Sequence, residues 1–129
     1  MKGPVYAILF VLILASCSIW LVSVYRENRE REKTRLNVRK MALSIRLEPQ
    51  QEEEIFELEC NRKLRIKELQ DSLKNNQAGL KQALSNLTAI HQKKIEMLLD
   101  SQQCVKYQKY RQALARKKVR NLKLFRKRK

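Results

Sequence analysis

The chain begins with a long apolar run and continues as a polar, highly charged sequence. Residues 4–25, PVYAILFVLILASCSIWLVSVY, contain no charged side chain. At ~1.5 Å per residue, a helix of this length rises roughly 33 Å, enough to cross the ~30 Å hydrocarbon core of a bilayer. A chain of 129 residues is too short to surround such a helix as a core. The pattern therefore predicts a transmembrane anchor or signal segment over residues 1–25.

Three fates of this segment fit the sequence. Leu14-Ala15-Ser16-Cys17 resembles a bacterial lipobox, which makes Cys17 a candidate for lipidation. A lipoprotein normally turns polar soon after its cysteine, whereas here the apolar run continues through SIWLVSVY. The apolar part of a cleaved secretory signal is shorter than this run. The pattern favours an uncleaved anchor, with lipidation and cleavage as alternatives.

Apolar residues recur at helical spacing through the polar part of the chain. They form two groups: Ile55, Leu58, Ile66, Leu69 and Leu73, then Leu80, Leu84, Leu87, Ile90, Ile95 and Leu98. Between the groups lies KNNQAG, residues 74–79, with two Asn and one of the two Gly residues of the chain. These turn-forming residues predict that the chain doubles back near Asn75.

The scarcity of turn residues elsewhere settles the fold class. With only two Gly and two Pro, the turns of a β-sheet protein are poorly supported. We predict an all-α protein with an N-terminal transmembrane helix, an extended helical hairpin and a C-terminal basic helix. The expected divisions after the anchor are a charged linker or helix over 26–42, the hairpin over 43–112 and a basic tail over 113–129.

One continuous coiled-coil helix is the alternative to the hairpin. A strict seven-residue spacing runs through the expected turn and joins Ile66, Leu73, Leu80 and Leu87. Asn76 would then be a polar residue that fixes register. The hairpin is favoured because Asn-Asn and Gly lower helix propensity where a break is useful.

A short motif occurs twice, with an offset of 52 residues from Leu47 to Leu99. Leu47-Glu48-Pro49-Gln50-Gln51 and Leu99-Asp100-Ser101-Gln102-Gln103 share a Leu, an acid, a helix-starting residue and two Gln in the same order. Pro suits the first helical turn, and Glu, Asp or Ser can cap it. In a hairpin both motifs lie at the same end, with the two leucines as apolar plugs beside the caps.

These paired motifs resemble the two L-T-x-x-Q motifs of the bacterial Spy/CpxP family. The Leu and the last Gln match in both copies, Pro49 matches a common variant, and the Thr is replaced by Glu48 and Asp100. The resemblance covers residues 41–112 and implies helical hairpins that dimerise into a thin cradle. The motif residues that it marks as structural are Leu47, Pro49, Gln51, Leu99 and Gln103.

Topology is where the resemblance and the charges disagree. Only Lys2 precedes the apolar run, whereas many cations follow it: Arg26, Arg29, Arg31, Lys33, Arg35, Arg39 and Lys40. The positive-inside rule therefore places the polar part in the cytoplasm. The family resemblance implies the periplasm, and we follow it because the rule weakens for longer translocated domains. The expectation is a single-pass protein of the bacterial inner membrane with a periplasmic soluble part.

The formal net charge of +16 implies acidic partners. Residues 116–129 hold nine cations and no acid, with Ala115, Val119, Leu122 and Phe125 at helical spacing. This pattern is typical of a basic amphipathic helix that binds a membrane surface or another anionic partner, although a solvated tail is the alternative. The candidate residues are Arg116, Lys117, Lys118, Arg120, Lys123, Arg126 and Lys127. The apolar run argues against nucleic acid as the partner.

Residues for catalysis or metal binding are sparse. The chain has one His, His91, and no Gly-rich phosphate loop or nucleophile elbow, so we predict no enzyme and no cofactor. We expect His91 to be an ordinary exposed helix residue, and Cys60 and Cys104 lack a C-x-x-C arrangement, so no metal site is predicted. In a hairpin these two cysteines lie too far apart for a bridge within one chain.

The predicted function follows from the resemblance and the charge. We expect a membrane-anchored, Spy/CpxP-like periplasmic protein that binds unfolded or stress-related envelope clients on a basic, partly apolar concave face, and that forms a homodimer. The alternatives are a bitopic coiled-coil subunit similar to division-complex or phage spanin proteins, a metal-responsive envelope sensor, and a cytoplasm-facing binder of nucleic acid or ribosomes.

Overall fold

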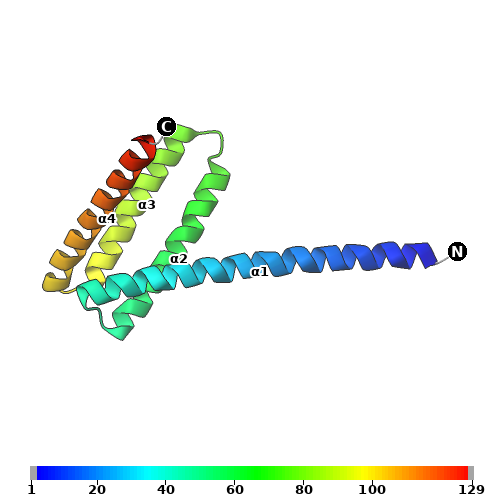
Figure 1. Ribbon diagram of the computed structural model, residues 1–129, viewed down its shortest axis with the longest axis horizontal. Coiled ribbons are helices and arrows are strands. Elements are labelled where there is room, and N and C mark those ends of the chain that lie inside the picture. Colours follow the sequence, from blue (N-terminus) through cyan, green and yellow to red (C-terminus); the bar gives the residue numbers. More distant parts are fainter. Residues whose placement is uncertain (1–2, 128–129) are drawn as a thin grey trace. The chain divides into compact units, whose positions relative to one another are not determined.

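The computed structural model describes residues 3–127, and these are helical apart from short turns (Figure 1). The four helices are α1 (Gly3–Ile45), α2 (Pro49–Ser72), α3 (Gln77–Leu98) and α4 (Ser101–Lys127). No strand occurs within the described range. The predicted all-α class is therefore confirmed. Lys2 and the last two residues of the basic tail lie outside the described residues.

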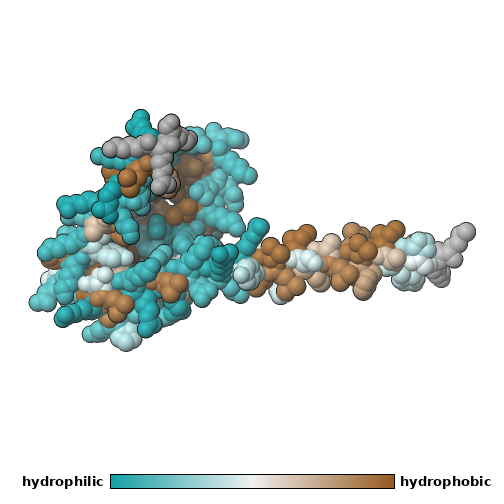
Figure 2. All heavy atoms as spheres, viewed as in Figure 1, coloured by the Kyte–Doolittle hydropathy of each residue, from teal (hydrophilic) through white to brown (hydrophobic). Residues whose placement is uncertain are grey.

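The chain divides into two compact units, and the boundary falls within α1, after Lys33. The described part of the first unit is helical, and its apolar side chains are exposed, including Leu9, Phe10 and Trp20. Figure 2 shows this part of α1 as a mostly apolar surface. Among the described residues, α1 alone is long and apolar enough to cross a membrane. The apolar run in the sequence predicted a helix of sufficient length and hydrophobicity.

The second unit begins at Thr34 and has one small core to which all four helices contribute. Its buried apolar side chains are Val38, Met41 and Ile45 from α1, Ile55, Phe56 and Cys60 from α2, Ile95 from α3, and Tyr107 from α4. A fully buried side chain of this size contributes about 1.5–3 kcal/mol relative to an exposed one. Few such residues are present, so each of them matters for the stability of the unit.

The carboxyl-terminal part of α1 belongs to this core. Thr34, Val38, Met41 and Ile45 are buried and recur at the three- and four-residue spacing of one helix face. Sequence analysis placed most of these residues in a charged linker or helix. The difference arises because cations occupy the neighbouring positions and mask the apolar stripe.

Helices α2 and α3 pack against each other as an antiparallel pair (Figure 1). Helix α2 ends at Ser72 and α3 begins at Gln77, so the described chain has no single helix across the expected turn. Asn76 caps α3, because its side-chain oxygen accepts a hydrogen bond from the N–H of Gly79 at 2.9 Å. A Cβ atom on Gly79 would lie 2.6 Å from the amide nitrogen of Asn76, so a larger residue there would have to displace the capping side chain.

We predict that Phe56→Ala costs about 3–5 kcal/mol in the free energy of unfolding, because it removes a large side chain that is only 2% exposed. This loss can be measured by urea unfolding in detergent, followed by the circular dichroism of the helices at about 222 nm. Leu64→Ala is the matched control on the same helix, because Leu64 is 56% exposed and should change stability by less than about 0.5 kcal/mol. Equal losses in the two variants would contradict the assignment of the core.

Candidate functional site

The last glutamines of the two repeated motifs pair directly with each other. Nε2 of Gln51 donates to Oε1 of Gln103 at 2.9 Å, and Nε2 of Gln103 donates to Oε1 of Gln51 at 2.9 Å. The two side-chain amides therefore form a closed pair that joins residues 52 positions apart. Gln103 is only 8% exposed, so the pair is largely shielded from water.

Each amide also binds the backbone of both interhelical turns. Nε2 of Gln51 donates to the carbonyl of Leu98 at 2.8 Å, and Nε2 of Gln103 donates to the carbonyl of Arg46 at 3.1 Å. The Oε1 atoms accept from the N–H groups of Glu48 and Asp100, at 3.0 and 3.1 Å respectively. We call the two amides with these four backbone groups the glutamine clasp.

The clasp accounts for the repeat in the sequence. The same offset that relates Gln51 to Gln103 also relates Arg46 to Leu98 and Glu48 to Asp100. Each amide uses two N–H donors and two acceptor positions, which is the full capacity of the group. The arrangement has approximate two-fold symmetry in its hydrogen bonds, so both turns need the same spacing of residues.

The two turns reach this symmetry with different backbones. Arg46 has a φ of 64°, in the left-handed region, and the N–H groups of Arg46 and Leu47 both donate to the carbonyl of Ala42. These bonds end α1 at a residue in the left-handed conformation, a position that glycine usually occupies. At the second turn Leu99 is extended, with a φ of −101°.

The remaining motif residues position the clasp. Leu47 and Leu99 are half-buried and pack against the core, as expected for apolar plugs. Pro49 is the first residue of α2, and the carboxylate of Asp100 accepts from the N–H of Gln103 at 2.7 Å at the start of α4. All five motif residues therefore lie at one end of the second unit.

His91 is buried, with 8% of its surface exposed, and not on the exposed surface as expected. Its Nε2 lies 2.9 Å from a carboxylate oxygen of Glu59, whose other oxygen pairs with Arg62 at 3.0 Å. Burial alone would raise the pKa of Glu59, but the hydrogen bonds and charges of His91 and Arg62 outweigh it and hold this pKa below its ordinary value of 4.5. The sequence missed this pair because its members lie on different helices.

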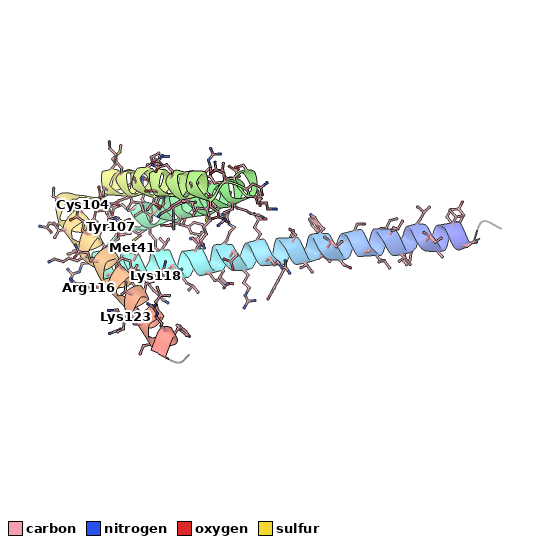
Figure 3. The ribbon with its side chains drawn as sticks, turned by 90° about the horizontal axis from the view of Figure 1, so that it is seen from above. Met41, Cys104, Tyr107, Arg116, Lys118 and Lys123 are labelled. Carbon is pink, nitrogen blue, oxygen red and sulfur yellow. The ribbon has the colours of Figure 1, made fainter. Side chains whose placement is uncertain are left out.

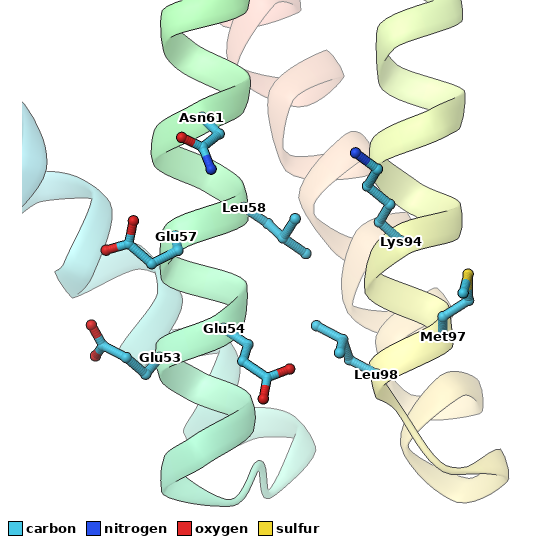
Figure 4. Close-up of a pocket in the computed structure, with 8 residues that line it drawn as sticks. All are labelled: Glu53, Glu54, Glu57, Leu58, Asn61, Lys94, Met97 and Leu98. Carbon is cyan, nitrogen blue, oxygen red and sulfur yellow. The ribbon is translucent and has the colours of Figure 1, made fainter.

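An open groove of about 550 Å³ runs between α2 and α3 near the clasp (Figure 4). Leu58 and Leu98 face each other across it, while Glu54 of α2 and Lys94 of α3 extend into the space. The full lining is Glu53, Glu54, Glu57, Leu58, Asn61, Lys94, Met97 and Leu98. Glu53 and Glu57 point away from the groove in Figure 4, and Glu53 pairs with Arg35 at 2.9 Å, so Glu54 is the lining carboxylate that faces the space. Sequence analysis expected a basic concave face.

The predicted anionic-partner residues lie on the second half of α4, as Figure 3 shows for Arg116, Lys118 and Lys123. The side chains are exposed at Arg116, Lys117, Lys118, Arg120, Lys123 and Arg126. Lys127 ends the helix, and its side chain lies outside the described part of the protein. In Figure 3 this half of α4 leaves the α2–α3 pair.

The cysteines lie in three different environments. Cys17 is exposed on α1, Cys60 is buried in the core, and Cys104 is half-buried with its sulfur 3.6 Å from the carbonyl of Glu96. Over residues 3–127 no group of three or more His, Cys, Asp or Glu side chains is placed to hold a metal ion.

Comparisons with protein-family models, with curated proteins and with solved structures give no match. The resemblance to the Spy/CpxP family therefore rests on the two motifs themselves.

We predict that Gln51→Ala and Gln103→Ala each cost about 1–3 kcal/mol in the free energy of unfolding, because each leaves a shielded amide without its partner. The double variant should cost less than the sum, with a coupling energy on the order of 1–3 kcal/mol, measured by a double-mutant cycle in urea. The neighbours Gln50 and Gln102 are exposed, so their alanine variants are matched controls. Simple additivity of the two losses would contradict a direct pair.

Acid should weaken the second unit partly through Glu59. A carboxylate whose pKa is lower in the folded state contributes stability above its ordinary value of 4.5, and this contribution is lost as the pH falls through the folded pKa. The stability advantage over Glu59→Gln should therefore shrink between about pH 6 and about pH 3 in urea titrations. Glu68→Gln is the control, because Glu68 pairs with Arg65 on the exposed surface. A constant advantage across this range would show that Glu59 has no lowered pKa.

Proposed function

We propose that the chain is a membrane-anchored, non-catalytic binding protein of the Spy/CpxP type, which holds unfolded or stress-related protein segments in the bacterial envelope. The glutamine clasp is the observation that supports this most. It brings together Gln51 and Gln103, the two residues on which the resemblance depends, and fixes both motif turns at one end of the second unit. In this proposal residues 43–112 act as an extended helical hairpin and 113–129 as a basic helix.

The first half of α1 suits the role of anchor. Its apolar side chains are exposed, and the hydroxyls of Ser16 and Ser18 donate to the carbonyls of Leu12 and Leu14 at 2.7 and 2.8 Å. Polar groups satisfied within their own helix are compatible with a hydrocarbon environment. A periplasmic location, dimerisation and lipidation of Cys17 stay predictions from the sequence. The coiled-coil subunit alternative needs one long helix, and α2 ends at Ser72.

The groove between α2 and α3 is the surface that we assign to clients. Leu58 and Leu98 offer apolar contact, and the carboxylate of Glu54 extends into the groove beside them. This chemistry suits segments with apolar and basic side chains. It differs from the acidic or amphipathic clients expected for a basic face, so the sign of the preferred client charge distinguishes the two surfaces.

We predict that the full chain in detergent binds a fluorescent peptide of alternating Leu and Lys more tightly than one of alternating Leu and Glu. Reversing the charge that extends into the groove, with Glu54→Lys, should weaken binding of the Leu/Lys peptide about fivefold in an anisotropy titration, because attraction becomes repulsion. Glu68→Lys makes the same charge change at an exposed site on α2 outside the groove and should have little effect. A preference for the Leu/Glu peptide, or equal effects of the two variants, would contradict the assignment.

A further inference from the structure

The second half of α4 carries an apolar face that the described protein leaves uncovered. Gln103 and Tyr107, near the start of the helix, are buried in the unit. At 100° per residue the same face continues through Leu114, Leu122 and Phe125. These three side chains are 50%, 61% and 70% exposed. This face of α4 is therefore buried in the first half of the helix and exposed in the second half.

The other side of this helix is strongly basic. With Ala115 and Val119, these three residues fill an arc of about 140°, and Leu124 is the exposed apolar side chain of this segment outside it. Most cations fall on the opposite arc: Arg116, Lys117, Arg120, Lys123 and Lys127. Lys118 and Arg126 border or interrupt the apolar arc, where long side chains can extend their charges sideways. No acid occurs in residues 116–129, so the charge is not neutralised within the segment.

We infer that residues 114–127, the basic segment, lie on the surface of an anionic lipid bilayer. A helix with apolar side chains on one face and cations on the other binds at the headgroup level, with the apolar face inserted and the cations on anionic headgroups. The partner is identified as lipid because the same chain carries an apolar helix able to cross a membrane. This step rests on the proposed membrane anchor and not on client binding.

Two stretches of helix, one in α1 and one in α4, lead away from the clasp. From Tyr25 to Arg46, α1 rises roughly 30 Å at ~1.5 Å per residue. The clasp then fixes Arg46 to Gln103 at 3.1 Å. From Gln103 to Lys127, α4 extends roughly 36 Å. The chain would be attached twice, once by insertion and once by adsorption.

The test uses the full chain reconstituted into vesicles, with the indole as probe. Trp20→Phe removes the native indole and Phe125→Trp places one on the exposed apolar face. In vesicles of phosphatidylcholine with about 30% phosphatidylglycerol, the indole at position 125 should emit at shorter wavelength and be quenched less by acrylamide than in phosphatidylcholine alone. About 0.5 M salt should reverse much of the difference, because it screens the headgroup charges.

A charge-matched pair of variants separates local attraction from net charge. Replacing Lys117, Arg120 and Lys123 by Gln removes three cations from the basic segment, and each loss should weaken partition about fivefold. Replacing the exposed Lys67, Lys74 and Lys81 by Gln removes the same charge elsewhere and should leave the indole protected. Equal quenching in neutral and anionic vesicles would overturn the inference. So would protection by added RNA or an acidic polypeptide in neutral vesicles, without protection by phosphatidylglycerol.

The two proposals fail separately. If lipid does not protect the indole but the Leu/Lys peptide still binds, the adsorbed helix is contradicted and the client groove is retained. If lipid protects the indole but the peptide does not bind, the groove is contradicted as a client site and the second membrane contact is retained.

Discussion

The second unit depends on one interaction, the reciprocal pairing of the Gln51 and Gln103 amides. The apolar core is small, and its members come from four helices whose ends meet at this point. Apolar contacts are non-directional, so they do not by themselves fix which turn faces which. The amides do, because each must find two donors and two acceptors once water is excluded. The clasp satisfies these groups only when the α1–α2 turn and the α3–α4 turn lie side by side, so it selects one arrangement of the four helices.

Acids and cations lie in different parts of the unit, which the net charge of +16 does not show. Acids gather near the start of α2, where they face the positive end of the helix dipole and border the groove. Cations gather on the far half of α4, which leaves the helix pair. In our proposals the groove takes apolar and basic protein segments, and the far half of α4 takes anionic headgroups. A net charge describes neither surface, and for this reason the sequence suggested a single basic face.

The helices could be predicted from the sequence, but some of the contacts between them could not. Apolar spacing indicated Ile55 and Ile95, and both are fully buried. It did not indicate the core residues of α1, because charged residues between them lower the apparent hydrophobicity of that stretch. Phe56, Cys60 and His91 were missed for another reason. Their burial is decided by which neighbouring helix covers them, and the partner of His91 is Glu59 on α2. The repeated motif pointed to the clasp region, yet nothing local shows that two glutamines will bind each other.

The departure of the motifs from L-T-x-x-Q can be judged from the atoms that the clasp uses. The second motif position, Glu48 or Asp100, gives its backbone N–H to a glutamine oxygen. Every residue except proline has this group, so the exchange of Thr for an acid leaves the clasp bonds intact. The side chain at this position has a separate task, shown by Asp100, which accepts the N–H of Gln103 as a helix cap. Thr and Asp both perform this task. The Gln is different, because no other uncharged side chain of that length offers both donors and acceptors. The clasp therefore constrains the Gln, whereas the Leu of each motif is held by its packing against the core.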